Sequence, residues 1–81
     1  MIDGEGFKLF LKDKGYSAAV VGDICSRAKR ADKLKEWSSD ELYLFQLEKD
    51  EAFQGFSVSV KSQIRKAVKL YNEYHSTTIK D

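Results

Sequence analysis

The chain has 81 residues, of which 42% are hydrophobic and 33% are charged, and its formal net charge at pH 7 is +1. These numbers describe one globular domain, close to the lower size limit at which an apolar core suffices without disulfides or metal. No apolar run approaches the roughly 20 residues of a membrane span, and the single cysteine excludes an internal disulfide. We therefore expect one domain over residues 1–81, no membrane association and a cytoplasmic location.

The first predicted helix covers about residues 5–14. Its apolar residues recur at three- and four-residue spacing on one helix face: Phe7, Phe10 and Leu11. Gly15 stands where a glycine with a left-handed backbone ends a helix, and Tyr16 is placed to fold back as the apolar contact after it. Ser17 then offers a side-chain oxygen as the N-cap of the next helix.

The second predicted helix covers about residues 18–36. Small residues dominate one stripe of it: Ala18, Ala19, Gly22, Ala28 and Ala31. This stripe predicts a tight contact between helices rather than a wide groove for a ligand, and Gly22 would leave room for the close approach. The basic residues stand outside the stripe: Arg27, Lys29, Arg30 and Lys33. Asp23 is spaced to pair with Arg27, which would add about 0.2–0.5 kcal/mol.

The third predicted helix covers about residues 40–53. Trp37, just before it, is expected to be a hydrophobic staple or a lid over the core, and the alternative is an exposed tryptophan that binds a partner. Ser38 and Glu41 have the spacing of a capping box. The predicted apolar arc of the helix comprises Leu42, Tyr43, Leu44, Phe45, Leu47 and Phe53. The largely acidic stretch Glu48-Lys49-Asp50-Glu51 is expected to form a solvated face.

The fourth predicted helix covers about residues 58–75 and is capped by Ser57 or Ser59. Its apolar residues repeat with the helical period and should face the core: Val60, Ile64, Ala67, Val68, Tyr71 and Tyr74. Its basic residues fall on the flanks and on the opposite face: Lys61, Arg65, Lys66 and Lys69. Residues 76–81 have no periodicity and should fray. The sequence thus predicts an all-α fold, a compact four-helix bundle.

Charge is segregated along the chain. Residues 17–37 carry five positive and three negative side chains, residues 38–54 one positive and five negative, and residues 57–76 four positive and one negative. Two cationic helices therefore bracket an anionic one. Either these faces complement each other inside one small domain, or the second and fourth helices point their basic sides the same way.

No residue pattern indicates catalysis. Cys25 has no histidine near it in the sequence and is expected to be a packed thiol. One cysteine and one histidine do not supply the four ligands of structural zinc. His75 is expected to be a helix-end residue that complements the helix dipole. The sequence also contains no paired carboxylates, Ser-His-Asp set or glycine-rich phosphate loop, so we expect no catalytic residue, no metal and no cofactor.

Three stretches carry a family resemblance: Phe7-Lys8-Leu9-Phe10-Leu11, Gly15-Tyr16-Ser17 and residues 60–74. They resemble the N-terminal core-binding domain of tyrosine recombinases, the phage-integrase family, a small SAM-like helical bundle, over roughly residues 7–75. The resemblance implies that the second and fourth helices lie against duplex DNA. It nominates nine DNA-binding residues: Ser17, Arg27, Lys29, Arg30, Lys33, Lys61, Arg65, Lys66 and Lys69. Their first role would be contact with phosphates, and base reading by arginine is left open. For each single residue, the alternative is a solvated surface charge with no DNA contact.

In that family, a separate and larger C-terminal domain carries the tyrosine nucleophile. Tyr71 and Tyr74 lie on the apolar stripe and are not expected to replace it. We therefore expect a non-catalytic DNA-binding module rather than an enzyme. The alternative is a small phage or mobile-element protein-interaction domain that uses the acidic third helix or exposed aromatics. The chain would be a monomer, or a weak homodimer in which the alanine-rich second helix packs against its copy.

Overall fold

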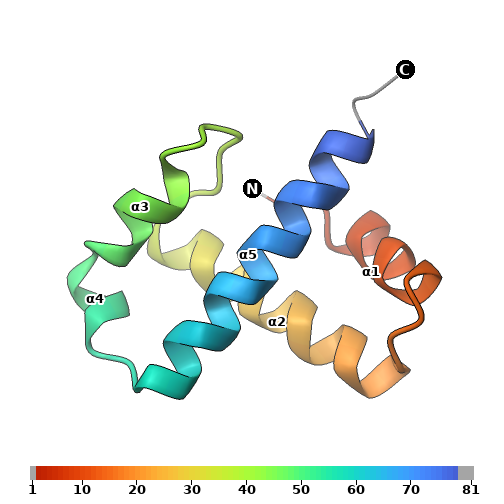
Figure 1. Cartoon of the computed structure of the whole chain (residues 1–81), viewed down its shortest axis with the longest axis horizontal. Coiled ribbons are helices and arrows are strands. Elements are labelled where there is room, and N and C mark those ends of the chain that lie inside the picture. The colour runs from red at the N-terminus through yellow and green to blue at the C-terminus, as the bar shows by residue number, and fades with distance from the viewer. Residues whose placement is uncertain (1, 79–81) are drawn as a thin grey trace.

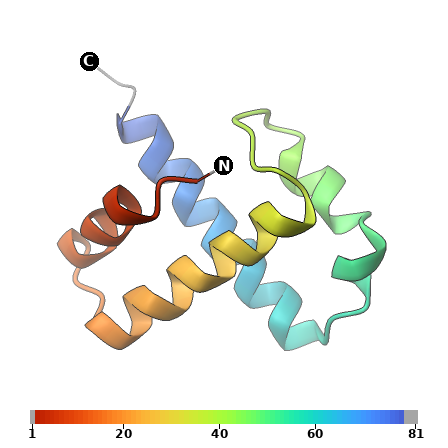
Figure 2. The same cartoon turned by 180° about the vertical axis from the view of Figure 1, so that it is seen from behind.

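The computed structural model describes residues 2–78 and shows five helices and no strand within that range (Figure 1). The helices are α1 (Gly4–Asp13), α2 (Ala18–Leu34), α3 (Tyr43–Glu48), α4 (Glu51–Gln54) and α5 (Val58–Thr78). The longest helix, α5, crosses α2 near the centre of the molecule, with α1 on one side of the crossing and α3 and α4 on the other (Figures 1 and 2). The all-helical fold class is confirmed.

The crossing of α2 and α5 forms the centre of the core. Each helix buries one stripe, and the side chains of these stripes are at most 5% exposed: Val21, Ile24, Cys25, Ala28 and Ala31 from α2, and Ile64, Ala67, Val68 and Tyr71 from α5. Alanines on both helices let the two backbones approach closely. Ala28 and Ala31 therefore pack inside the chain. Gly22 does not have the predicted role, because it is exposed and a Cβ there would meet no atom within 4 Å.

The other helices extend this core on both sides of the crossing. Phe7 and Leu11 of α1 pack in one cluster, while Tyr43, Leu47 and Phe53 of α3 and α4 pack in the other. Trp37 lies against both clusters. Its ring makes an edge contact with Tyr71 at 4.8 Å between centroids, and its indole N–H donates to Asn72 Oδ1 at 2.9 Å. The tryptophan is thus a lid over the core.

The turn between α1 and α2 forms as its sequence predicts. Gly15 has a φ of +96°, in the left-handed region. The Gly15 N–H donates to the Lys12 carbonyl at 2.9 Å, and the Tyr16 N–H donates to the Leu11 carbonyl at 3.3 Å. These two bonds satisfy carbonyls that the end of a helix leaves open. Ser17 Oγ accepts the Val20 N–H at 3.3 Å, which confirms Ser17 as the N-cap of α2.

The predicted third helix over residues 40–53 is wrong as a single element, because the chain breaks at Asp50. The backbone of Asp50 is extended, with φ −66° and ψ 133°. Its carboxylate accepts the N–H groups of Ala52 at 2.9 Å and Phe53 at 3.2 Å. Aspartate competes with the helix in this way, since its side chain offers the backbone another partner. Asp50 therefore ends α3 and begins α4.

The predicted capping box of Ser38 and Glu41 does not form. Ser38 Oγ instead accepts the Asp40 N–H at 3.3 Å, and Asp40 Oδ1 accepts the Leu42 N–H at 2.8 Å. These short-range bonds hold residues 38–42 in turns, and α3 begins only at Tyr43. The loop before α3 is therefore longer than the sequence predicts.

Two other helix ends differ from the prediction. The second helix ends at Leu34, because Lys35 is extended with φ −151° and ψ 121°. The hydroxyl of Tyr43 donates to the Lys35 carbonyl at 2.6 Å, which satisfies a backbone acceptor at this end. The last helix continues to Thr78, so the predicted fraying is wrong for residues 76–78. Residues 79–81 lie outside the described part of the chain.

Candidate nucleic-acid interface

A group of cationic side chains lies along α2, with Arg30 and Lys33 opposite its buried stripe, Arg27 on the flank toward α5 and Lys29 on the flank beside Gly4 of α1. We call it the α2 basic face, and it comprises Arg27, Lys29, Arg30 and Lys33. Arg27 is half-buried at the edge nearest α5, and the other three are exposed. Within residues 2–78 none of the four forms an ion pair, so the expected pairing of Asp23 with Arg27 is not made. Their charges are therefore open to an external anion.

The surface of the α2 basic face is hollowed in two places. Arg27 and Arg30 line a groove with Val60 and Gln63 of α5, and a second groove lies along α2 between Ser26 and Lys33. The Arg30 guanidinium stands 5.7 Å from the centre of the Phe56 ring. A cation over an aromatic ring is attracted by the negative ring face, which restrains this long side chain.

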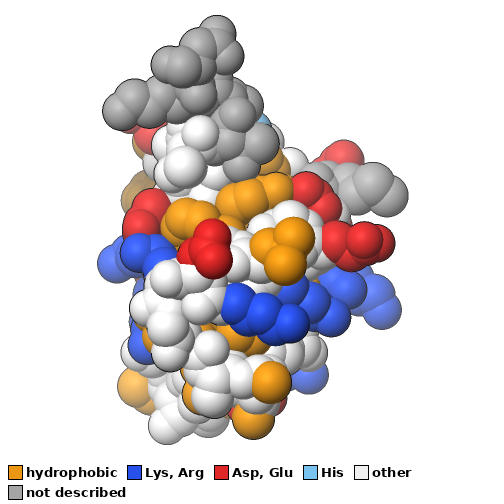
Figure 3. Space-filling model, turned by 90° about the vertical axis from the view of Figure 1, so that its right-hand side faces the viewer, with side chains coloured by type: hydrophobic (Ala, Val, Ile, Leu, Met, Phe, Trp, Pro, Cys, Tyr) orange, Lys and Arg blue, Asp and Glu red, His pale blue; other side chains and the backbone are white. Residues whose placement is uncertain are grey.

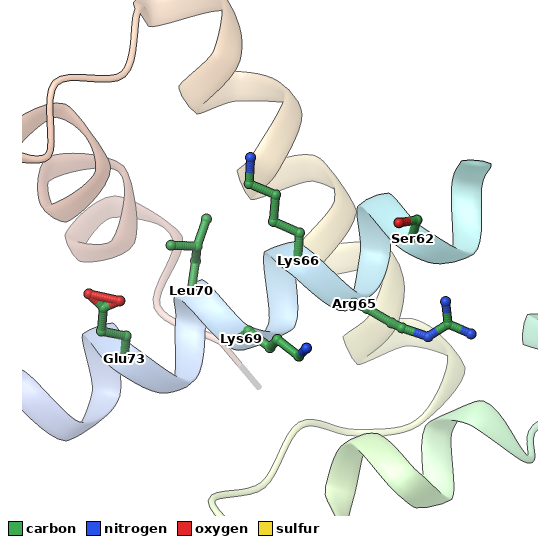
Figure 4. Close-up of a pocket in the computed structure, with 6 residues that line it drawn as sticks. All are labelled: Ser62, Arg65, Lys66, Lys69, Leu70 and Glu73. Atoms are coloured by element: carbon green, nitrogen blue, oxygen red, sulfur yellow. The ribbon is translucent and has the colours of Figure 1, made fainter. Parts of the chain in front are cut away.

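The solvent side of α5 carries a second cationic group, which we call the α5 basic face: Arg65, Lys66 and Lys69. Figure 4 shows these side chains on a shallow groove with Ser62, Leu70 and Glu73. Arg65 extends toward α3 and α4, and Lys66 extends the other way (Figure 4).

Two residues that line this groove already have charged partners. The Arg65 guanidinium lies 3.2 Å from Glu48 Oε1 and 5.7 Å from the centre of the Phe53 ring. Glu73, the acidic residue of the groove, pairs with Lys14 at 2.7 Å. This hydrogen bond to Glu73 raises the pKa of Lys14 above its usual value. Lys66 and Lys69 form no ion pair within residues 2–78, so they carry the available charge of the α5 basic face.

The two basic faces point away from each other. In Figure 1, α5 lies in front of α2, and in Figure 2 the order is reversed. Because the helices bury facing stripes against one another, the sides that carry their exposed cations lie on opposite sides of the molecule. The prediction that both helices point their basic sides the same way is therefore wrong, and the nine nominated residues do not form one surface.

The remaining two nominated residues lie apart from both basic faces. Ser17 Oγ is engaged as the N-cap of α2. Lys61 is half-buried in the first turn of α5. Neither residue is a member of the exposed cationic groups described above.

An exposed apolar pair at the start of α3, with Leu42 at the N-cap and Phe45 in the helix, was not found by sequence reasoning. Leu42 is 54% exposed and Phe45 is 59% exposed, although the helical pattern places both in the apolar arc. The six-residue α3 buries only Tyr43 and Leu47, one turn apart. The Lys49 ammonium lies 4.5 Å from the centre of the Phe45 ring. The signal that could have found this pair is Asp50, which shortens the helix and so limits how much of it can reach the core.

The side of the molecule over α1 is mixed in character. Hydrophobic side chains are exposed there among a band of Lys and Arg side chains and groups of Asp and Glu side chains (Figure 3). Leu9 of α1 is 65% exposed. No single charge dominates this side, in contrast to the α2 basic face.

The residues singled out for possible chemistry are held in structural contacts. Cys25 is 1% exposed, and its thiol lies 3.9 Å from the Gly4 carbonyl oxygen. His75 packs against Trp37 at 4.8 Å between ring centres. The Tyr71 hydroxyl accepts the Asp3 N–H at 2.8 Å. Within residues 2–78 no group of three potential ligands could hold a metal ion, and no helix there has the length and apolar content to cross a membrane.

Comparison of the chain with protein-family models, with curated proteins and with solved structures gave no match. The resemblance to recombinase core-binding domains therefore stays a hypothesis that depends on the stretches quoted from the sequence.

Proposed function

We propose that this chain is a non-catalytic module that binds the phosphate backbone of duplex DNA, with the α2 basic face as its main contact surface. The observation that supports this proposal is the set of four cationic side chains on residues 27–33, none of which has an acidic partner within residues 2–78. A helix rises 1.5 Å per residue, so these side chains span about 9 Å. Successive phosphates of one strand are spaced about 3.4 Å along the duplex axis, so the span matches two to three such spacings, or three to four phosphates.

The resemblance to tyrosine recombinases favours the same helix. We propose that the bundle is of the SAM-like type, in which α3 and α4 together take the place of the third helix. In that family the helices corresponding to α2 and α5 both lie against one duplex, and because the basic faces of these helices are opposed here, the proposal keeps only the α2 contact. The α2 basic face would therefore serve as the docking surface, and contact with phosphates would position the domain without reading sequence.

A fluorescence titration of labelled random duplex tests this proposal. If four cations neutralise four phosphates, the log–log slope of affinity against salt is about −3.6, and affinity falls about 150-fold between 50 and 200 mM salt. The variant Arg30→Glu/Lys33→Glu should lose most binding. The control Lys8→Glu/Lys12→Glu makes the same change in net charge on the exposed side of α1. An absence of binding by the wild type at low salt refutes the proposal.

A second candidate function is binding of a protein partner through α3. Two observations favour it: the apolar side chains of Leu42 and Phe45 are exposed, and the acidic residues Asp40 and Glu41 directly precede Leu42. Capture of a protein from cell extract by the wild type and by Arg30→Glu/Lys33→Glu, but not by Leu42→Ser/Phe45→Ser, would support this function. Equal capture by all three proteins would rule out the α3 surface.

A further inference from the structure

The molecule is thin in the direction that separates its two basic faces. Its extents along the principal axes are 34, 28 and 15 Å, and Figure 1 is viewed down the shortest of these. In that view α5 lies over α2. One helix with its side chains is about 10–12 Å in diameter, so the two stacked helices separate the outer surfaces by about 20 Å. Seen from the side, Lys and Arg side chains reach both edges of the molecule (Figure 3).

The α5 basic face has the chemistry to hold a second phosphate backbone. Lys66 and Lys69 are exposed one turn apart, and the Ser62 hydroxyl beside them can donate to a phosphate oxygen. The acidic residue of this groove, Glu73, is paired with Lys14. Arg65 is 34% exposed at its side chain and remains within the groove despite its contact with Glu48. The surface is therefore cationic overall, although it offers fewer unpaired charges than the α2 basic face.

A single straight duplex cannot use both surfaces. The buried stripes of α2 and α5 lie between them, and a duplex resting on one face is separated from the other by the full thickness of the two helices. Two separate duplexes can be accommodated, one on each side. We propose that this chain bridges two DNA duplexes, holding one on the α2 basic face and a second on the α5 basic face. The inference rests on the proposed function, because it requires the α2 basic face to bind DNA.

The two surfaces should differ in strength. The α2 basic face has four cations without an acidic partner in the described range, and the α5 basic face has two, Lys66 and Lys69. Fewer neutralised phosphates give a weaker contact at a given salt concentration. The second duplex should therefore be released at a lower salt concentration than the first. At an intermediate salt concentration, bridging should therefore be lost while the α2 basic face still binds one duplex.

A capture experiment with two duplexes tests the bridge. One duplex is fixed to beads, a second duplex of unrelated sequence carries a fluorophore, and the protein is added in increasing amounts at low salt. The wild type should retain fluorescence on the beads with a maximum at intermediate protein concentration, because excess protein coats each duplex separately. Binding of one labelled duplex in solution is measured in parallel for every protein.

Variants of each surface give distinct outcomes. Lys66→Glu/Lys69→Glu should keep single-duplex affinity within about 3-fold of the wild type while capture falls by about 10-fold or more. Arg30→Glu/Lys33→Glu should lose both readouts, and the control Lys8→Glu/Lys12→Glu should keep both. Circular dichroism confirms that each variant is helical.

Three results would overturn the bridge. Undiminished capture by Lys66→Glu/Lys69→Glu would mean that two copies of the chain join the duplexes through their α2 faces. Binding of one duplex by the wild type without capture of a second would limit the chain to a single surface. An absence of any binding would refute the proposed function itself and the bridge with it.

Discussion

Replacing Tyr43 by phenylalanine removes one hydroxyl from the contact that holds α3 against the end of α2. The side chain is 1% exposed, and its hydroxyl lies 2.6 Å from the Lys35 carbonyl oxygen and 3.2 Å from that of Ala31. The Ala31 carbonyl also accepts the Lys35 N–H at 3.0 Å. The Ala31 carbonyl therefore keeps a hydrogen-bond partner in the variant, and the Lys35 carbonyl is the acceptor that loses its partner.

The expected cost follows from this one acceptor. A neutral hydrogen bond contributes about 0.5–1.5 kcal/mol net, and a fully buried acceptor without a partner costs about 1–3 kcal/mol. Lys35 is an exposed residue, so water can replace part of the lost bond. We expect Tyr43→Phe to lower the free energy of unfolding by about 1 kcal/mol, or the Tm by about 4–8 °C for a domain of this size. Urea denaturation followed by circular dichroism measures this change.

The pH dependence of the same variant gives a second readout. Burial, with a smaller contribution from the charge of Asp32, raises the pKa of Tyr43 from 10.0 to about 12. The unfolded chain therefore releases this proton near pH 10, whereas the folded chain keeps it until about pH 12. The stability that Tyr43 contributes is complete below pH 10 and is lost as the pH rises to about 12. The difference between the wild type and Tyr43→Phe should shrink across this window.

The control for this experiment is Tyr16→Phe, because the Tyr16 hydroxyl makes no hydrogen bond within residues 2–78. It should change the free energy of unfolding by less than about 0.5 kcal/mol. If Tyr43→Phe costs no more than Tyr16→Phe at neutral pH, the hydroxyl does not hold α3 in place. A difference between the wild type and Tyr43→Phe that stays constant from pH 10 to 12 would contradict the assigned pKa.

Four further changes test local packing, each by urea denaturation. Gly22→Ala should stabilise the chain by about 0.5–1 kcal/mol, since a Cβ there meets open space in a helix interior. Gly6→Ala should instead destabilise it by about 1 kcal/mol, because the new Cβ overlaps the Tyr74 hydroxyl. Equal effects of the two substitutions on the free energy of unfolding would contradict this contrast. Asp50→Ala should cost about 0.5–2 kcal/mol through the lost cap of α4, and an unchanged midpoint would show that the cap contributes nothing. Phe45→Ser should stay within about 0.5 kcal/mol of the wild type, because the ring is 59% exposed, and a larger loss would mean that the ring packs.

Long helices with regular apolar spacing could be predicted from the sequence. In α5, Ile64, Val68 and Tyr71 recur over several turns, so one face is defined and the structure buries it. The turn at Gly15 could be predicted for a different reason. A glycine after a helix, followed by an aromatic residue, satisfies the terminal carbonyls by local bonds that need no distant partner.

The segment of residues 40–53 could not be predicted as it is, because two local preferences compete there. The apolar spacing of Leu42, Phe45 and Phe53 favours a continuous helix, and Asp50 favours a new N-cap. Which of the two forms depends on which apolar side chains each conformation of this segment buries. By breaking at Asp50, the chain brings both Leu47 of α3 and Phe53 of α4 to at most 1% exposure against the α2–α5 core. The cost is that Leu42 and Phe45 are left in solvent.

The candidate site depends on a relation between helices that periodicity does not encode. The spacing of residues along the chain predicts which side of α2 is cationic and which is apolar, and it predicts the same two sides for α5. The spacing does not predict whether the two helices lie side by side under a third layer or stack directly on each other. In the first arrangement the basic sides can share one surface, and in the second they must oppose. The structure has the second arrangement, because alanines such as Ala28 and Ala67 let the stripes of α2 and α5 meet directly. The same packing that removes a single broad clamp for one duplex therefore creates the geometry required to hold two.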